Sequence, residues 1–130
     1  MANKIIQLSD GTDNIYPCGN VILYSNFFTP ESGYTVRVNK FQKVGHLAFL
    51  RLTINKGGTV FSGRELTGTL AEGFRPTLGS IVIRAGAHNA VNTTVNRNVG
   101  VAILNSGIVY VDAHGTTDVQ EVSISVAFII

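Results

Sequence analysis

The most regular pattern of hydrophobic and polar positions lies at the end of the chain, in VQEVSISVAFII. Every second residue there is apolar, and polar or small residues stand between them. The apolar positions are Val122, Ile124, Val126, Phe128 and Ile130. Such alternation is typical of a β-strand with one buried face. We therefore expect a strand that runs to residue 130 and is held in a sheet.

Two further alternating segments, residues 34–45 and 46–55, adjoin at Gly45 and predict an antiparallel hairpin. The second segment places aliphatic residues on one face and Leu47 and Phe49 on the other. Large apolar side chains are unfavourable on a face that meets water. We interpret Leu47 and Phe49 as a second buried surface, and they are our candidate subunit-contact residues.

The rest of the chain supports an all-β fold. Residues 80–87 form another apolar run, and residues 102–113 predict a hairpin around Asn105-Ser106-Gly107, because Asn and Gly tolerate the positive φ of tight turns. No segment of useful length has helical periodicity, and the glycines fall between the apolar runs. Short strands at turn-marked intervals predict an antiparallel β-sandwich with a jelly-roll-like arrangement.

The first part of the sequence has a different character. It carries one short apolar run, residues 5–8, then turn residues and a stop at Pro17. A strand that short is not stable alone, so it must pair with the main sheet or with another chain. We divide the chain into an N-terminal arm or attachment segment, residues 1–33, and a head domain, residues 34–130.

The segment TLAEGFRPTLGS, residues 69–80, predicts a rigid bend between two halves of the sandwich. Pro76 fixes its own φ and favours an extended Arg75, and Gly73 permits a sharp turn. Phe74 can plug the end of the core, while Arg75 points to solvent or caps a neighbouring carbonyl. Gly73, Phe74, Arg75 and Pro76 therefore have a structural explanation that needs no ligand.

Two segments around this bend carry a family resemblance. KFQKVGHLAFLRLTI, followed by GRELTGTLAEGFRPT, resembles the C-terminal β-sandwich head domains of bacteriophage tail-fibre, head-fibre and receptor-binding proteins, in which a segment of the form tLPeGFrP follows a hairpin. Ala71 stands where the family usually has proline. The matching residues are Leu70, Glu72, Gly73, Phe74, Arg75 and Pro76.

The opening NKIIQLSDGTDNIYP is similar to the start of many phage minor structural and fibre proteins. Together the two resemblances imply a homotrimer located on the virion. They also imply binding to a host-cell surface and an N-terminal arm that contacts other virion proteins. The single cysteine, Cys18, fits a protein made in a reducing cytoplasm, here that of the bacterial host.

Composition narrows the function classes. Only 14% of residues are charged, which fits either a surface partly covered by copies of the chain or a polar surface rich in Ser, Thr and Asn. The net charge of +2 comes from scattered basic residues, so we expect no nucleic-acid partner. No apolar run is long enough for a membrane span or a signal peptide. The one cysteine, Cys18, excludes an intrachain disulfide.

Residue types that carry chemistry are sparse and dispersed. His46, His88 and His114 have no metal-ligand spacing, although His88 and His114 could approach each other in the fold. Cys18 lacks a local base, and several acidic residues lie in turn-like sequence. We therefore expect no catalytic activity, no metal and no cofactor.

The segment AHNAVNTTVNRNVG, residues 87–100, is the candidate ligand-binding loop. Its amides and hydroxyls both donate and accept hydrogen bonds, which suits sugar hydroxyls. The other interpretation is an ordinary exposed connection. The candidate residues are Asn89, Asn92, Thr93, Thr94, Asn96 and Asn98.

A group of aromatic residues before the main strands also has two interpretations. Tyr24, Phe27, Phe28 and Tyr34 could form a stacking platform for sugars, or they could pack the arm against the body or a neighbouring subunit. Phe without polar neighbours is typical of a core, which favours packing.

Three functions remain open at this point. The first is a phage virion structural protein of the fibre or receptor-binding type, which attaches the particle to the host surface and for which a surface glycan is a candidate receptor. The second is a free carbohydrate-binding module or lectin-like domain. The third is a hydrolase on a jelly-roll scaffold, for which no catalytic constellation is present. The low charge, the apolar positions Leu47 and Phe49 and the resemblance favour the first.

Overall fold

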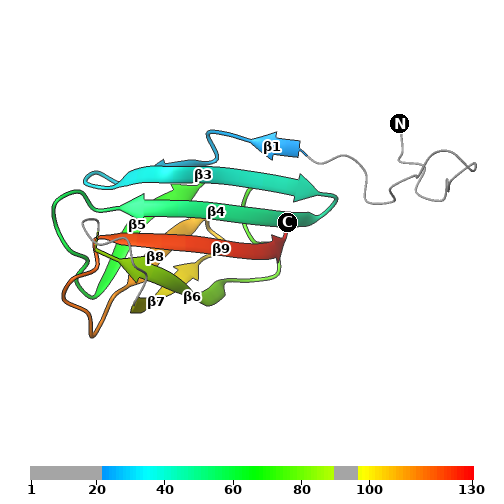
Figure 1. Ribbon diagram of the computed structural model, residues 1–130. Coiled ribbons are helices and arrows are strands. Elements are labelled where there is room, and N and C mark those ends of the chain that lie inside the picture. Colours follow the sequence, from blue (N-terminus) through cyan, green and yellow to red (C-terminus); the bar gives the residue numbers. More distant parts are fainter. Residues whose placement is uncertain (1–21, 90–96) are drawn as a thin grey trace, which may run out of the picture.

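The computed structural model describes residues 22–89 and 97–130 (Figure 1). Within these residues the chain forms strands and turns, and no segment is a helix that could cross a membrane. The strands are β1 (Ile22–Tyr24), β2 (Phe28–Pro30), β3 (Thr35–Val44), β4 (Leu47–Asn55), β5 (Arg64–Leu70), β6 (Ile81–His88), β7 (Arg97–Ile103), β8 (Ile108–Asp112) and β9 (Glu121–Ile129).

All of the described strands belong to one antiparallel sheet, in the order β1-β3-β4-β9-β6-β7-β8-β5-β2. The sheet curls into a nearly closed, barrel-like shape, so that β3, β4 and β9 form a layer in front of β5, β7 and β8 (Figure 1). The predicted all-β antiparallel fold is therefore confirmed. The predicted sandwich and jelly-roll are not confirmed, because hydrogen bonds join the described strands into one sheet.

A short seam holds the two layers together. β9 pairs with β4 along its whole length, from Ile129 opposite Leu47 to Glu121 opposite Asn55. On its other edge β9 pairs with β6 at only three positions, from Gly86 to His88. The preceding part of β6 leaves β9 and pairs only with β7, which turns the sheet from the front layer into the back layer.

The predicted hairpins are present. β3 and β4 pair across a turn in which Gly45 has φ +60°, and β7 and β8 pair across a turn in which Gly107 has φ +95°. Positive φ is easily adopted only by glycine, which explains these residues at these turns. The final alternating segment forms β9 as predicted.

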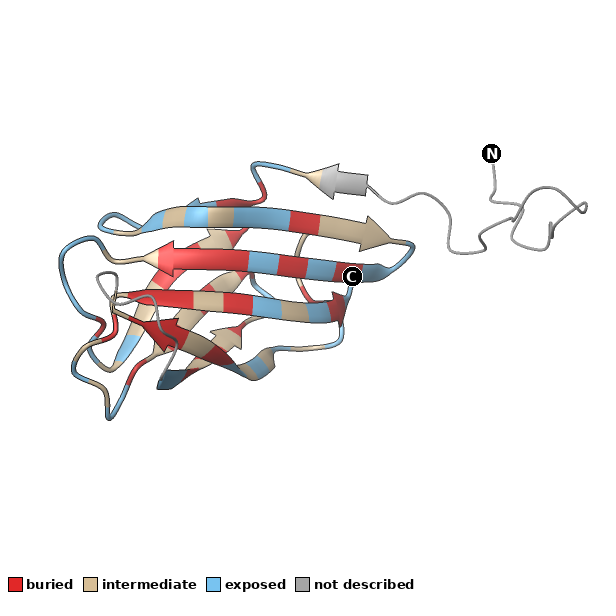
Figure 2. Ribbon diagram, viewed as in Figure 1, coloured by how far each residue is buried: buried red, intermediate tan, exposed pale blue. Residues whose placement is uncertain are grey.

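Alternation along the strands produces the core. Buried and exposed residues alternate along β4 and β9 (Figure 2), and the buried residues of both strands belong to one hydrophobic core. Phe41 is fully buried, and its ring centroid lies 4.9–6.3 Å from those of four other aromatic rings. Phe27 and Phe28 are also buried. Their burial favours the interpretation that these two residues pack in the core, rather than the interpretation that they form a platform for sugars.

The first described strands belong to the region expected as an arm. β1 pairs with β3, and β2 pairs with β5, so both ends of the sheet order come from residues 22–30. The expected strand at residues 5–8 and Cys18 lie outside the described residues. The division at residue 33 stays a prediction.

Candidate functional site

The bend between β5 and β6 closes one end of the core. The ring of Phe74 lies edge-on to Tyr24 and Phe41, with centroids 5.1 and 4.9 Å apart. Arg75 Nε donates a hydrogen bond of 2.9 Å to the carbonyl oxygen of Leu70, and Pro76 is buried. Gly73 has φ +87°. The bend residues thus contact their own chain, as a structural role requires.

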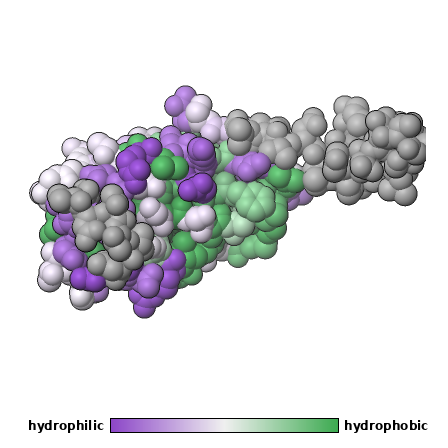
Figure 3. All heavy atoms as spheres, viewed as in Figure 1, coloured by the Kyte–Doolittle hydropathy of each residue, from purple (hydrophilic) through white to green (hydrophobic). Residues whose placement is uncertain are grey.

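Leu47 and Phe49 lie on the outer face of the front layer. They pair with Ile129 and Ala127 of β9, and Leu47 also pairs with Val44 of β3. We call Val44, Leu47, Phe49, Ala127 and Ile129 the apolar face. Phe49 is 41% exposed. Hydrophobic residues gather on this side of the molecule, toward the end where β3 turns into β4 (Figure 3).

The predicted ligand loop is only partly described. Asn89 follows β6 directly, and Asn98 is exposed in β7. Asn92, Thr93, Thr94 and Asn96 lie outside the described residues. Asn98 stands two residues before Gly100, so the two share the outer face of the back layer.

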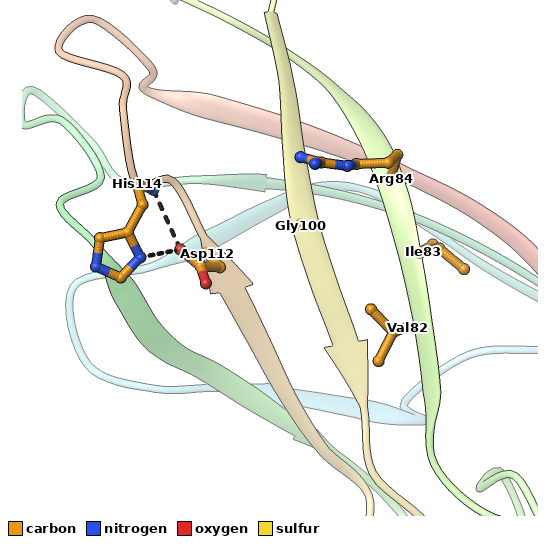
Figure 4. A pocket seen from close by; sticks show the side chains of 6 residues that line it. All are labelled: Val82, Ile83, Arg84, Gly100, Asp112 and His114. Atoms are coloured by element: carbon orange, nitrogen blue, oxygen red, sulfur yellow. Dashed lines mark hydrogen bonds and ion pairs between the residues drawn. The ribbon is translucent and has the colours of Figure 1, made fainter.

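That outer face is hollowed around Gly100. A depression of about 470 Å³ is lined by Val82, Arg84, Gly100, Asp112 and His114. We call it the outer-face depression. Arg84 extends from β6 across β7, and Asp112 and His114 lie on the other side of Gly100 (Figure 4).

A smaller hollow of about 130 Å³ continues the outer-face depression past Ala102 to Tyr110 and Arg64. In the strand register Gly100 is opposite Arg84 on one side and Asp112 on the other. Ala102 is likewise opposite Val82 and Tyr110. Small residues of β7 therefore form the floor, and larger residues of β6 and β8 form the walls.

Glycine at position 100 keeps the floor of the outer-face depression open, although the backbone conformation there does not require glycine. A Cβ atom at this position would lie 3.5 Å from Asp112 Cβ, which is an ordinary contact, and Gly100 lacks the positive φ found at the turn glycines. Glycine in a strand interior weakens the strand and often marks a close approach by a ligand or another backbone. The open floor is therefore a property of the surface rather than a requirement of the fold.

The charged side chains around the outer-face depression differ in whether they have an interaction partner. Asp112 accepts hydrogen bonds from the backbone N–H of His114, at 3.1 Å, and from His114 Nδ1. The backbone hydrogen bond from His114, with its ring and the charge of Arg64, lowers the pKa of Asp112. Arg64 also stacks on the ring of Tyr110, with Cζ 4.2 Å from the centroid. Within the described residues Arg84 forms no ion pair.

The groups of the outer-face depression are suited to binding. Guanidinium groups donate hydrogen bonds, the Asp112 carboxylate accepts them, and Val82, 79% exposed, offers an apolar contact. Within the described residues no cluster of His, Cys, Asp and Glu is placed to hold a metal ion. His46 lies at the β3–β4 turn, where its carbonyl accepts a hydrogen bond from Ile130.

A second polar cluster is buried at the seam between the layers. Glu121 is 3% exposed, and its carboxylate bonds Arg37 (2.5 and 3.0 Å), Asn55 (3.1 Å) and His88 Nε2 (2.9 Å). His88 Nδ1 lies 2.9 Å from the carbonyl of Asn89. Both ring nitrogens of His88 thus lie within hydrogen-bond distance of an oxygen atom. The hydrogen bonds from Arg37 outweigh burial and lower the pKa of Glu121.

Sequence reasoning missed the outer-face depression. Alternation does place Val82 with Arg84 and Tyr110 with Asp112 on one face of their strands. The cross-strand register that gathers them around Gly100 has no signal in the sequence. His88 and His114, considered as a pair, instead bind separate carboxylates, Glu121 and Asp112.

Comparison with known proteins shows a similarity of fold rather than of sequence. No protein-family model matches the sequence, and no curated protein matches it significantly. Among solved structures, the receptor-binding protein (gp15) of Listeria phage PSA is similar, with a TM-score of 0.59 and 17% sequence identity. The match covers 85% of this chain and 67% of that one. At this identity the likeness concerns the fold alone.

Proposed function

We propose that this chain is the head of a phage fibre or receptor-binding protein, a virion component that attaches the particle to the host-cell surface. The observation that carries the proposal is the fold likeness to the receptor-binding protein of Listeria phage PSA over 85% of the chain. The resemblance of residues 70–76 to the bend segment of phage fibre heads is an independent support, because it rests on sequence.

The working form of the head is a homotrimer in this proposal. The apolar face leaves Leu47, Phe49 and Ile129 partly exposed, and coverage by neighbouring copies would remove that apolar surface from water. The low share of charged residues fits a surface that is partly covered. We describe each subunit as a jelly-roll-like sandwich, supported by the two facing layers of the curled sheet.

Residues 1–33 form the attachment segment in this proposal and contact other virion proteins. Host recognition then falls to the polar outer surface of the head, which includes the candidate loop around Asn98 and the outer-face depression. The partner on the host is a surface glycan. Neutral amides, hydroxyls and charged side chains there supply the donors and acceptors that sugar hydroxyls require.

Cross-linking of purified phage particles tests both location and assembly. Particles of the phage that carries the gene are treated with a lysine-reactive cross-linker and blotted with an antibody against this chain. We expect bands at one, two and three times the mass of the uncross-linked protein, with the ladder ending at three. Absence of the chain from washed particles would exclude a virion protein. A ladder that ends at one or two copies would exclude the trimer.

A further inference from the structure

The outer-face depression has a charge pattern that selects one kind of ligand. Two guanidinium groups, Arg64 and Arg84, border it together with one carboxylate, Asp112. Asp112 is engaged by His114, and the charge of Arg64 also acts on it. Arg64 is further engaged by the ring of Tyr110. Arg84 is the cation that has no counter-charge within the described residues.

We propose that the outer-face depression binds a sugar unit that carries a single acidic substituent, with the acidic group on Arg84 and neighbouring hydroxyls on Asp112 and His114. This inference rests on the proposed attachment function and names the ligand class for it. Arg84 is exposed and extends across β7 toward the Asp112 side (Figure 4), so its guanidinium fork is available to a carboxylate or a phosphate.

The spacing of the strands fits a ligand of this size. Neighbouring strands lie about 4.8 Å apart, so the backbones of β6 and β8 are separated by about 10 Å across Gly100. The gap has no side chain at Gly100 and only a methyl group at Ala102. A single ring can therefore lie on β7 between Arg84 and Asp112, with its apolar side toward Val82.

The carboxylate of Asp112 argues against more highly charged ligands. A nucleic acid or a polyphosphate would bring a second anion toward Asp112, where like charges repel. A neutral sugar would leave the Arg84 guanidinium without a charged partner. One acidic group flanked by hydroxyl groups matches the arrangement of a cation on one wall and an acceptor on the other.

Residue-resolved NMR titration tests the inference on the whole chain. The probes are glucuronic acid, glucose 6-phosphate, neutral glucose and inorganic phosphate, each added to ¹⁵N-labelled protein. We expect at least one acidic sugar to shift the amides of Gly100, Ala102 and Asp112, with affinity at least about tenfold higher than that of glucose or inorganic phosphate. The acidic sugar that binds identifies the substituent as carboxylate or phosphate.

Two variants and a matched control locate the site. Arg84→Gln removes the uncompensated charge, and Gly100→Val fills the floor where a Cβ has room. Arg51→Gln removes another exposed arginine, from the outer face of the front layer. We expect both depression variants to weaken acidic-sugar binding by about tenfold or more and the control to leave it unchanged. The NMR spectra of all three report whether the fold is intact.

Three results would overturn the inference. The first is that glucose binds as tightly as both acidic sugars. The second is that inorganic phosphate binds as tightly as both acidic sugars. The third is that the Arg84→Gln and Arg51→Gln variants bind the acidic sugar with equal affinity. A host-cell adsorption assay distinguishes failure of the acidic-sugar inference from failure of the proposed attachment function. If wild type and Arg84→Gln bind cells equally, attachment stands and the depression is not its site. If the wild type binds no cells, the attachment proposal itself fails.

Discussion

Replacing Glu121 with alanine is expected to lower the free energy of unfolding by about 1–3 kcal/mol, the cost typical of leaving a buried hydrogen-bond donor without its acceptor. The main reason is His88, which is 5% exposed and would lose the acceptor of its Nε2 proton inside the protein. Arg37 contributes less, because its side chain is 61% exposed and water can solvate it. Chemical denaturation followed by circular dichroism measures the loss.

The position of Glu121 makes this effect larger than that of a surface acid. It stands opposite His88 at the end of the three-residue seam that joins the front and back layers. Glu31 is an exposed acid on the connection after β2, and Glu31→Ala should change stability by less than about 0.5 kcal/mol. Equal losses in the two variants would show that the Glu121 cluster does not hold the seam.

Lowering the pH should weaken the stabilising contribution of the same cluster. The hydrogen bonds from Arg37 lower the pKa of Glu121 in the folded state below its ordinary value of 4.5. Its stabilising contribution is therefore complete above about pH 4.5 and is lost as the pH falls through the folded pKa. Glu121→Gln cannot titrate, so its stability should fall less steeply than that of the wild type over this acidic range.

Gly107→Ala is expected to cost about 3 kcal/mol or more, because it combines a strained backbone with a steric clash. Gly107 has φ +95°, and a Cβ there would lie 2.4 Å from the Leu70 carbonyl oxygen and 2.6 Å from Arg75 Nε. Leu70 and Arg75 are the residues whose hydrogen bond fixes the bend. The substitution therefore forces the β7–β8 turn away from the bend, and a thermal melt should show the loss.

Gly115→Ala separates the two causes. Gly115 has φ +82°, but a Cβ there would meet no atom within 4 Å. Its replacement should cost only about 1–2 kcal/mol for the left-handed conformation. If both glycine variants lost the same stability, the contact between the turn and the bend would contribute nothing.

The local elements could be predicted because their signals are local. Alternation marked β4 and β9, and Gly45 and Gly107 marked the hairpin turns at which positive φ is needed. The way in which the strands join could not be predicted from the same signals. β6 pairs with β7 from Ile81 to Ala87 but with β9 only at its last three residues, and the extent of this second pairing depends on the curl of the whole sheet.

The sites were harder to predict than the strands. Alternation assigns Glu121 to the outer face of β9, yet Arg37, Asn55 and His88 arrive from three other strands to surround it. The outer-face depression likewise exists because a glycine of β7 falls between Arg84 and Asp112 in the register. Such long-range pairing depends on tertiary structure, and no motif of a single segment encodes it.

Competition for adsorption is the most direct test of the attachment function. Host bacteria are incubated with the purified chain, washed, and then exposed to the phage that carries the gene. The fraction of phage left free in the medium after a fixed time is counted as plaques. The account predicts that the free fraction rises with the concentration of the chain, whereas heat-denatured chain has no effect. Unchanged adsorption at saturating chain, with no chain retained on the washed cells, would contradict it.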